Sequence, residues 1–226
     1  MATPRLDSEE RRKGIVDAAL PLFARKGFSG TTTREIAAAA GVSEALLFKH
    51  FPSKAALYQE IILLGCEGHP AMEQVDQLAP SVESLIGMVG LMVRHFVLCP
   101  RGSPDDFRYR LLVMSFLEDG EYARLVFDWA AGRVYPKFAA CLDAARQEGL
   151  VAETAISAMS RFQFGHYVAI MLNCLRMPEP SAIPGGGDPE LLIADATQFI
   201  LRGIGLKDEV IARYRPAALT AALEKE

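Results

Sequence analysis

Cysteines and long hydrophobic runs are both scarce in this chain of 226 residues. Its four cysteines include no C-x-x-C pair, which excludes a disulfide framework and gives no support to a zinc site. The longest apolar run, Leu85 to Val93, covers nine residues and ends at Arg94, whereas a membrane-spanning helix needs about 20. We therefore expect reduced thiols, no metal, no cofactor and no membrane span.

A secretory signal is also missing, because residues 1–12 are polar and charged and contain no apolar stretch. A cytoplasmic protein is the expectation. Half of the residues are hydrophobic and 23% are charged, which supplies enough apolar material for a core and excludes a disordered chain.

The charge is unevenly distributed along the chain. Residues 1–54 contain nine Lys or Arg against six Asp or Glu, a balance of +3, whereas residues 55–226 contain fifteen against twenty-two, a balance of -7; together they give the net charge of -4. A basic segment attached to an acidic body indicates that only the first segment meets an anionic polymer.

Helical patterns cover nearly the whole chain. An apolar stripe at i, i+3, i+4, i+7 and i+8 begins at Ile15 and predicts a first helix that ends at Gly27. Pro21 lies inside it and removes one backbone hydrogen bond, at a cost of up to about 3 kcal/mol, so we expect a kink but no break. Longer helices are predicted over residues 81–99, 106–118, 121–148, 154–177 and 189–203, with a loop over 178–187 and a weak helix over 208–226.

Two short capped helices follow the first one. Thr32 and Glu35 have the spacing of a capping box, Gly41 ends that helix, and Ser43 caps a third helix over residues 44–51. Leu47 and Phe51, four residues apart, are expected to face a small core, which leaves the opposite face of the third helix outward. Two short helices joined at a glycine predict a helix-turn-helix, whose second helix fits the major groove of DNA.

The segment from residue 12 to residue 64 contains the motifs A-R-K-G-F, T-T-T-x-x-I-A, G-V-S, L-F-K-H-F and P-S-K-x-x-L. It resembles the DNA-binding domain of the TetR family of transcriptional regulators. The resemblance implies an all-α protein with a helix-turn-helix domain at 1–54, its recognition motif at 33–52, and a helical effector-binding and dimerisation domain at 55–226. It also implies a homodimer on an inverted-repeat DNA operator, most often a repressor released by a small apolar effector.

Carried over by position, the resemblance assigns the DNA contacts. These are Thr32, Thr33 and Arg34 at the start of the second helix, Ser43, Glu44, Ala45, Leu46, Phe48, Lys49 and His50 on the recognition helix, and Lys54 as a phosphate contact at the start of the fourth helix. Leu46 and Lys49 depart from the family pattern, so Leu46 is read as a contact to a thymine methyl and Lys49 as a contact to a guanine edge or to a phosphate. Glu44 accepts from a cytosine or only stabilises its helix terminus, and His50 packs internally or contacts a phosphate.

Met and aromatic side chains on the later helices suggest an effector pocket. The candidates are Met92, His95, Phe96, Met114, Phe162, His166 and Met171, with Arg94 or Arg161 as a possible polar anchor. Such a set either encloses an apolar cavity or fills an ordinary core. The stripe Leu192, Ala196, Phe199 and Gly203, together with Phe162, His166 and Ala169, predicts a four-helix dimer interface; core helices of a monomer are the alternative.

Catalytic signatures are absent, since the sequence holds no G-x-S-x-G, no paired metal ligands and no glycine-rich dinucleotide turn. We therefore expect no enzyme. A DNA-binding protein without a small-molecule ligand, architectural or partner-controlled, is the alternative function. The 172 residues from 55 to 226 favour the ligand-gated regulator, because dimerisation alone needs fewer.

Overall fold

The computed structural model describes residues 8–66, 70–178, 181–182 and 188–213. These residues form twelve α-helices, and the β pairing among them is one isolated antiparallel bridge between Val151 and Leu206. The predicted all-α fold is confirmed. The expectations for residues 1–7 and 214–226, and for most of the loop 178–187, lie outside the described residues.

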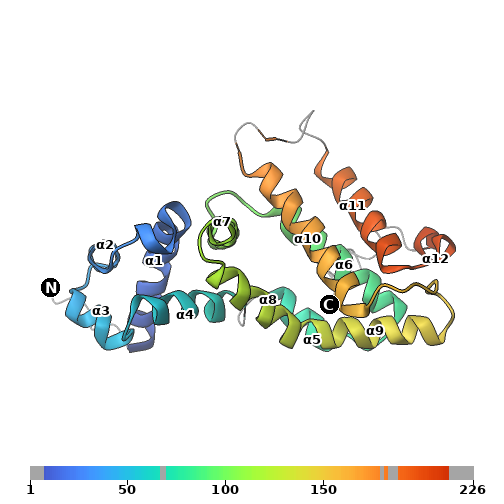
Figure 1. Ribbon diagram of the computed structural model, residues 1–226, viewed down its shortest axis with the longest axis horizontal. Coiled ribbons are helices and arrows are strands. Elements are labelled where there is room, and N and C mark those ends of the chain that lie inside the picture. Colours follow the sequence, from blue (N-terminus) through green and yellow to red (C-terminus); the bar gives the residue numbers. More distant parts are fainter. Residues whose placement is uncertain (1–7, 67–69, 179–180, 183–187, 214–226) are drawn as a thin grey trace. The chain divides into compact units, whose positions relative to one another are not determined.

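The helices follow one another through the chain as drawn in Figure 1. Their bounds are α1 Ser8–Gly30, α2 Thr33–Ala39, α3 Glu44–His50, α4 Lys54–Cys66, α5 Pro70–Gln77, α6 Val82–Leu98, α7 Pro104–Leu117, α8 Glu121–Arg133, α9 Tyr135–Gln147, α10 Ala158–Arg176, α11 Pro189–Ile204 and α12 Asp208–Arg213.

The first of two compact units comprises residues 1–69 and 100–127. It holds α1 to α4, α7 and the start of α8, and α1 packs against α2, α4 and α7. Its core contains Phe23, Leu47, Leu57 and Leu111, each 0% exposed. The domain boundary that the sequence predicts after residue 54 stays a prediction, but this unit keeps α4 and α7 with the helix-turn-helix.

The second unit comprises residues 70–99 and 128–226. In it α6 packs against α9, α10 and α11, and α10 packs against α9 and α11; α10 and α11 run side by side in Figure 1. Leu85, Val93, Leu142 and Ala169 are fully buried in its core. The segment that connects α9 to α10 is joined to the residues after α11 by the bridge between Val151 and Leu206.

Helix α1 continues through Pro21 as the apolar stripe predicts, and its helical geometry breaks at Gly27, where φ is 70° and ψ is 179°. The single helix predicted over 121–148 is wrong. The structure divides it into α8 and α9 at Val134, because Pro136 has no N–H for the carbonyl of Gly132 and its ring obstructs a continuous helix. Helix α5 is missing from the sequence prediction, and α10 begins at Ala158 after the cap Ser157, four residues later than predicted.

Candidate nucleic-acid interface

The start of α2 is held by the predicted capping box, which the structure confirms. The backbone N–H of Thr32 donates to Glu35 Oε2 at 3.0 Å, and the backbone N–H of Glu35 donates to Thr32 Oγ1 at 3.3 Å. Lys26 Nζ lies 2.5 Å from Glu35 Oε1. Hydrogen bonds from Lys26 and from Thr32 lower the pKa of Glu35 to about 2, so this cap stays ionised at any physiological pH. Thr33 and Arg34 follow it in the first turn.

A tight turn joins α2 to α3. Val42 N–H donates to Ala37 O at 2.9 Å and Gly41 N–H donates to Ala38 O at 3.2 Å, the paired bonds of a Schellman motif. Gly41 has φ 65°, a left-handed conformation that glycine adopts without a Cβ penalty. Ser43 then caps α3, because its Oγ accepts from the N–H of Leu46 at 3.2 Å. The turn fixes the direction in which α3 leaves α2.

Helix α3 has one buried face and one exposed face, as the sequence predicts. Leu47 is 0% exposed and Phe51, its C-cap, is 1% exposed. On the outward side Ala45 and Lys49 are exposed and Phe48 is 45% exposed. This outward face of α3 therefore presents both an aromatic ring and a cation to solvent.

Glu44 and Thr33 belong to different helices but are joined directly. Thr33 Oγ1 donates to Glu44 Oε2 at 2.9 Å. This bond fixes the carboxylate at the first turn of α3, next to the positive end of the helix dipole. The sequence left open whether Glu44 reads a base or stabilises its helix; the structure provides it with an internal partner that leaves one carboxylate oxygen for a further contact.

Arg12 of α1 connects the end of α3 to α4. Its Nε and Nη2 donate to the two carboxylate oxygens of Glu60 at 2.9 and 2.7 Å, and its Nη1 donates to the carbonyl of His50 at 2.9 Å. The guanidinium also lies 4.4 Å from the centre of the Phe51 ring. One side chain of α1 thereby holds the end of α3 and the middle of α4. Sequence reasoning missed this clamp, because its partners lie 38 and 48 residues away.

Lys54 is held inside the same unit. Its Nζ donates to the carbonyls of Phe28 at 2.7 Å and Thr31 at 2.9 Å, and it lies 4.2 Å from the centre of the Phe28 ring. An ammonium group has three donors, so the two carbonyls leave one for a phosphate oxygen. Lys54 therefore has a structural role that the sequence did not predict, whereas its phosphate contact stays a prediction.

The predicted effector set is only partly brought together. His166 lies against Phe162 and Phe96, with ring centres 5.0 and 6.3 Å apart, and His95 lies 5.8 Å from Phe96. Burial lowers the pKa of His166 to about 4, so this imidazole is neutral. Met171 does not belong to such a cluster, because it is 56% exposed on α10. Met114 belongs to the first compact unit.

The predicted dimer set is divided between core and surface. Phe162, Ala169 and Ala196 are buried within the protein's own core, and their part in an intermolecular interface stays a prediction. Phe199 is 66% exposed and Gly203 is exposed, while Leu192 and His166 are partly buried. The exposed apolar residues of α10 are different ones, namely Phe164, Tyr167, Met171 and Leu175.

The residues that the structure describes contain no cluster of three or more His, Cys, Asp or Glu side chains placed to hold a metal ion. None of their helices is both long and apolar enough to cross a membrane.

Together these features define an all-helical protein with an N-terminal helix-turn-helix of the DNA-binding type. Residues 15–61 match the family described as bacterial regulatory proteins, tetR family. This N-terminal segment is therefore similar to the DNA-binding domain of TetR family transcriptional regulators.

The relatives that share this segment are themselves regulators. The chain is 44% identical over 55 residues to the HTH-type transcriptional regulator AcrR of Shigella flexneri, which is 24% of this chain and 26% of that protein. It is also 44% identical over 52 residues to the HTH-type transcriptional repressor KstR2 of Rhodococcus jostii, 23% and 26% of the two chains. The matched segments thus span about a quarter of the length of these curated relatives.

Solved structures match over most of the chain. A tetR-family regulatory protein from Rhodococcus RHA1 aligns with a TM-score of 0.63 at 20% identity, over 88% of this chain and 99% of its own. NalD of Pseudomonas aeruginosa, the secondary repressor of the MexAB-OprM multidrug efflux pump, aligns with a TM-score of 0.62 at 22% identity, over 89% and 100%. At such identities the likeness establishes the fold of the C-terminal helices.

Proposed function

We propose that this protein is a homodimeric transcriptional regulator that acts as a repressor and inserts α3 into the major groove of an inverted-repeat operator. The observation that carries the proposal is the exposed face of α3, which presents Ala45, Phe48 and Lys49 on a helix that Arg12 and the Gly41 turn hold in place. A B-DNA major groove admits one α-helix. The positive balance of residues 1–54 complements the phosphate backbone.

The contacts divide into two kinds. Thr32, Thr33, Arg34, Ser43, His50 and Lys54 are assigned to phosphates, where hydroxyl, backbone and cationic donors fix the register of a protein on DNA. Glu44, Ala45, Leu46, Phe48 and Lys49 are assigned to base edges, since they begin or line the outward side of α3. Lys49 carries most of the base preference, because an ammonium group discriminates in favour of guanine O6 and N7.

The dimer is assigned to the outward faces of α10 and α11. Phe164, Tyr167, Met171 and Leu175 recur along α10 at i, i+3, i+7 and i+11, and Leu191 and Phe199 are exposed on α11. A surface with this many large apolar side chains on two neighbouring helices favours association. A second copy of the chain fits it, because a two-fold axis places the same stripe opposite itself and yields a four-helix bundle.

Effector control is assigned to the region where α6, α10 and α11 pack together. Four buried polar atoms of the described residues have no hydrogen-bond partner within the protein, and three of them lie on α10 and α11: His166 Nδ1, Asn173 Oδ1 and Thr197 Oγ1. Buried polar atoms are otherwise nearly always paired. Because apolar side chains surround them, a mainly apolar molecule with one or two polar groups suits this region. Such an effector lowers operator affinity by its preference for the conformer that does not bind DNA.

The DNA-binding proposal is tested with duplexes selected by the protein from a random pool. Fluorescence anisotropy then compares the wild type with Lys49→Ala and with Arg202→Ala, an exposed arginine on α11 that serves as a charge-matched control. Lys49→Ala is expected to weaken binding to the selected duplex by about 1–3 kcal/mol and to alter the base preference at one position, while Arg202→Ala has no effect. Failure to select any sequence contradicts the proposal.

The alternative is a DNA-binding regulator without a small-molecule ligand. A second measurement distinguishes it from a regulator that an effector controls. Apolar compounds are titrated into the complex of the wild type with the selected duplex. Release of the DNA by at least one compound, with a reduced effect in His166→Phe, supports effector control. Unchanged affinity across the compound set favours the architectural or partner-controlled regulator.

A further inference from the structure

A polar hollow of about 920 Å³ lies in the second unit, beside the segment that connects α9 to α10. It is lined by Arg146, Gly149, Val151, Ala152, Glu153, Thr154, Ala155, Arg161 and Lys207. None of these residues belongs to the predicted effector set except Arg161, which was named there only as an anchor. Its volume lies within the range of about 300–1,000 Å³ of small-molecule sites, but three of its side chains are cationic.

Arg161 is the buried member of this group. The residue is 2% exposed, and its Nε and Nη1 donate to the carbonyls of Ile156 at 3.0 Å and Ile204 at 2.7 Å. These neutral carbonyl oxygens accept from two of its five N–H donors and do not neutralise its charge. Among the described residues no carboxylate lies within ion-pair distance of this guanidinium. A buried charge without an opposite charge is costly, and an anion in the hollow removes that cost.

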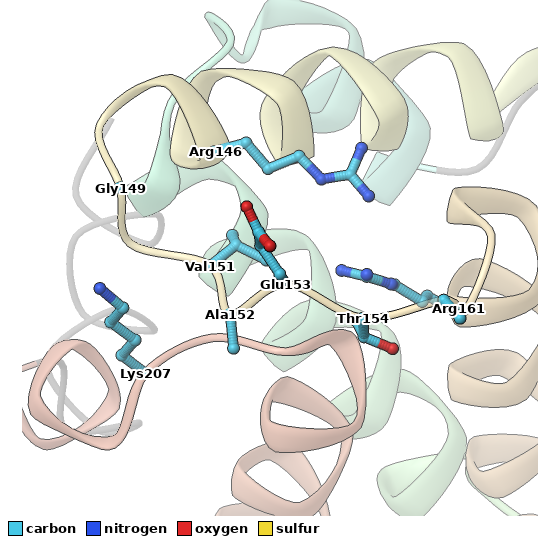
Figure 2. A pocket seen from close by; sticks show the side chains of 9 residues that line it. Arg146, Gly149, Val151, Ala152, Glu153, Thr154, Arg161 and Lys207 are labelled. Atoms are coloured by element: carbon cyan, nitrogen blue, oxygen red, sulfur yellow. The ribbon is translucent and has the colours of Figure 1, made fainter.

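Arg146 brings a second guanidinium to the same place. In Figure 2 the end groups of Arg146 and Arg161 extend from opposite sides into one space, with the carboxylate of Glu153 beside them. Burial, and then repulsion by Arg146, lower the pKa of Arg161. Arg146 also forms an exposed ion pair with Asp143 at 3.1 Å, on its own helix.

Backbone hydrogen bonds join the two segments that form the wall of the hollow. Ala152 N–H donates to Gly205 O at 2.8 Å and Lys207 N–H donates to Leu150 O at 3.1 Å, which ties the α9–α10 connection to the turn between α11 and α12. Gly205 has φ 98°, and a Cβ there would lie 3.3 Å from Arg161 Nη1. Two segments far apart in sequence thus place Arg161, Arg146 and Lys207 around the hollow, with Glu153 as the single lining carboxylate.

We propose that this hollow is a binding site for a small oxyanion, the phosphate or carboxylate group of a metabolite. Guanidinium groups bind both anions through paired, charge-assisted hydrogen bonds, and Lys207 offers a further cation at the rim. The site is separate from the apolar region among α6, α10 and α11 and does not depend on DNA binding.

A purely structural role for Arg161 is the competing explanation, because its bonds to Ile156 and Ile204 already join α10 to the end of α11. That role accounts for Arg161 and gives no function to Arg146 or Lys207. Variants of the exposed cations Arg146 and Lys207 therefore distinguish an anion site from a purely structural role of Arg161. Unlike Arg161→Ala, they leave the buried bonds of Arg161 intact, so the protein should still fold.

The test measures the thermal unfolding midpoint of the full-length protein against rising inorganic phosphate and, in a second series, citrate, with ionic strength held constant by sodium chloride. The variants are Arg146→Ala and Lys207→Ala. Arg133→Ala is the matched control, since it removes an exposed arginine whose partner, Asp76, is also partly exposed on the same unit. A further variant, Arg161→Lys, keeps the charge and removes the planar fork.

The midpoint of the wild type is expected to rise with one of the two anions, and the anion that acts identifies the group that the site prefers. The apparent Kd is expected to increase about tenfold in Arg146→Ala and in Lys207→Ala, which corresponds to about one charge-assisted hydrogen bond. Arg133→Ala should match the wild type. Absence of any shift beyond that of chloride, or an equal response in all the variants, overturns the proposal.

Discussion

The backbone N–H of Phe28 donates to Glu118 Oε2 at 3.2 Å, although the two residues lie 90 positions apart. Phe28 follows the break in α1, and Glu118 is the C-cap of α7. Gly27, the residue before Phe28, has φ 70°, and a Cβ there would lie 1.8 Å from Glu118 Oε1. The ends of α1 and α7 are therefore fixed to each other at a position where only glycine fits.

This relationship predicts the effect of adding one methyl group. Gly27→Ala imposes a left-handed backbone on alanine and displaces the Glu118 carboxylate, so it should lower the free energy of unfolding by about 1–3 kcal/mol. Gly14→Ala is the matched control, because a Cβ on Gly14 in α1 would have no neighbouring atom within 4 Å, and it should raise the free energy of unfolding by up to about 1 kcal/mol. Urea denaturation measures both, and equal effects would contradict the assignment.

Lys54 should contribute to both stability and DNA binding. Lys54→Ala removes the ammonium donor from the carbonyls of Phe28 and Thr31, which should cost about 1–3 kcal/mol of folding free energy. If the third donor of the ammonium meets a phosphate, the plot of log affinity against log salt should also become shallower, by about 0.9 in the magnitude of its slope. A salt-dependent titration checks this. A destabilised protein with an unchanged slope would mean that Lys54 is purely structural.

The exposed stripe predicts which residue controls assembly. Phe199→Asp places a charge on the outward face of α11 and should shift a dimer towards monomers without unfolding the protomer, because Phe199 is 66% exposed. Ile156→Asp, the same kind of change at an exposed apolar residue outside α10 and α11, should leave the dimer intact. Light scattering of the purified proteins decides the matter, and a monomeric wild type would exclude the proposed interface.

Stability should depend on pH through His166. Burial lowers the pKa of this imidazole from 6.5 to about 4, so between these values the unfolded chain binds more protons than the folded one. The contribution is therefore complete above pH 6.5 and is lost as the pH falls to 4, by at most about 1.4 kcal/mol per pH unit. Denaturation curves of the wild type and His166→Phe should diverge across this window; parallel pH profiles would argue against a buried neutral imidazole.

The DNA-binding region was the part of the molecule most accessible to sequence reasoning. The cap at Thr32, the turn at Gly41 and the cap at Ser43 depend on backbone groups only a few residues away, so the local sequence is enough to predict them. The two faces of α3 follow equally from the spacing of Leu47 and Phe51. The sequence missed the division of α8 from α9, although Pro136 carries a local signal for it.

Contacts between distant segments were decided by the tertiary structure. Helix α10 is apolar on more than one face, so its periodicity alone does not determine that Phe162 is buried while Met171 faces solvent; the packing of α6 and α11 against one face decides it. The bond from Phe28 to Glu118 and the two carbonyls held by Arg161 also join segments far apart in the chain. The sequence alone determines structure where partners lie within a few residues, because helical and turn geometry then fixes their distance, whereas long-range partners are selected only by the packing of whole helices.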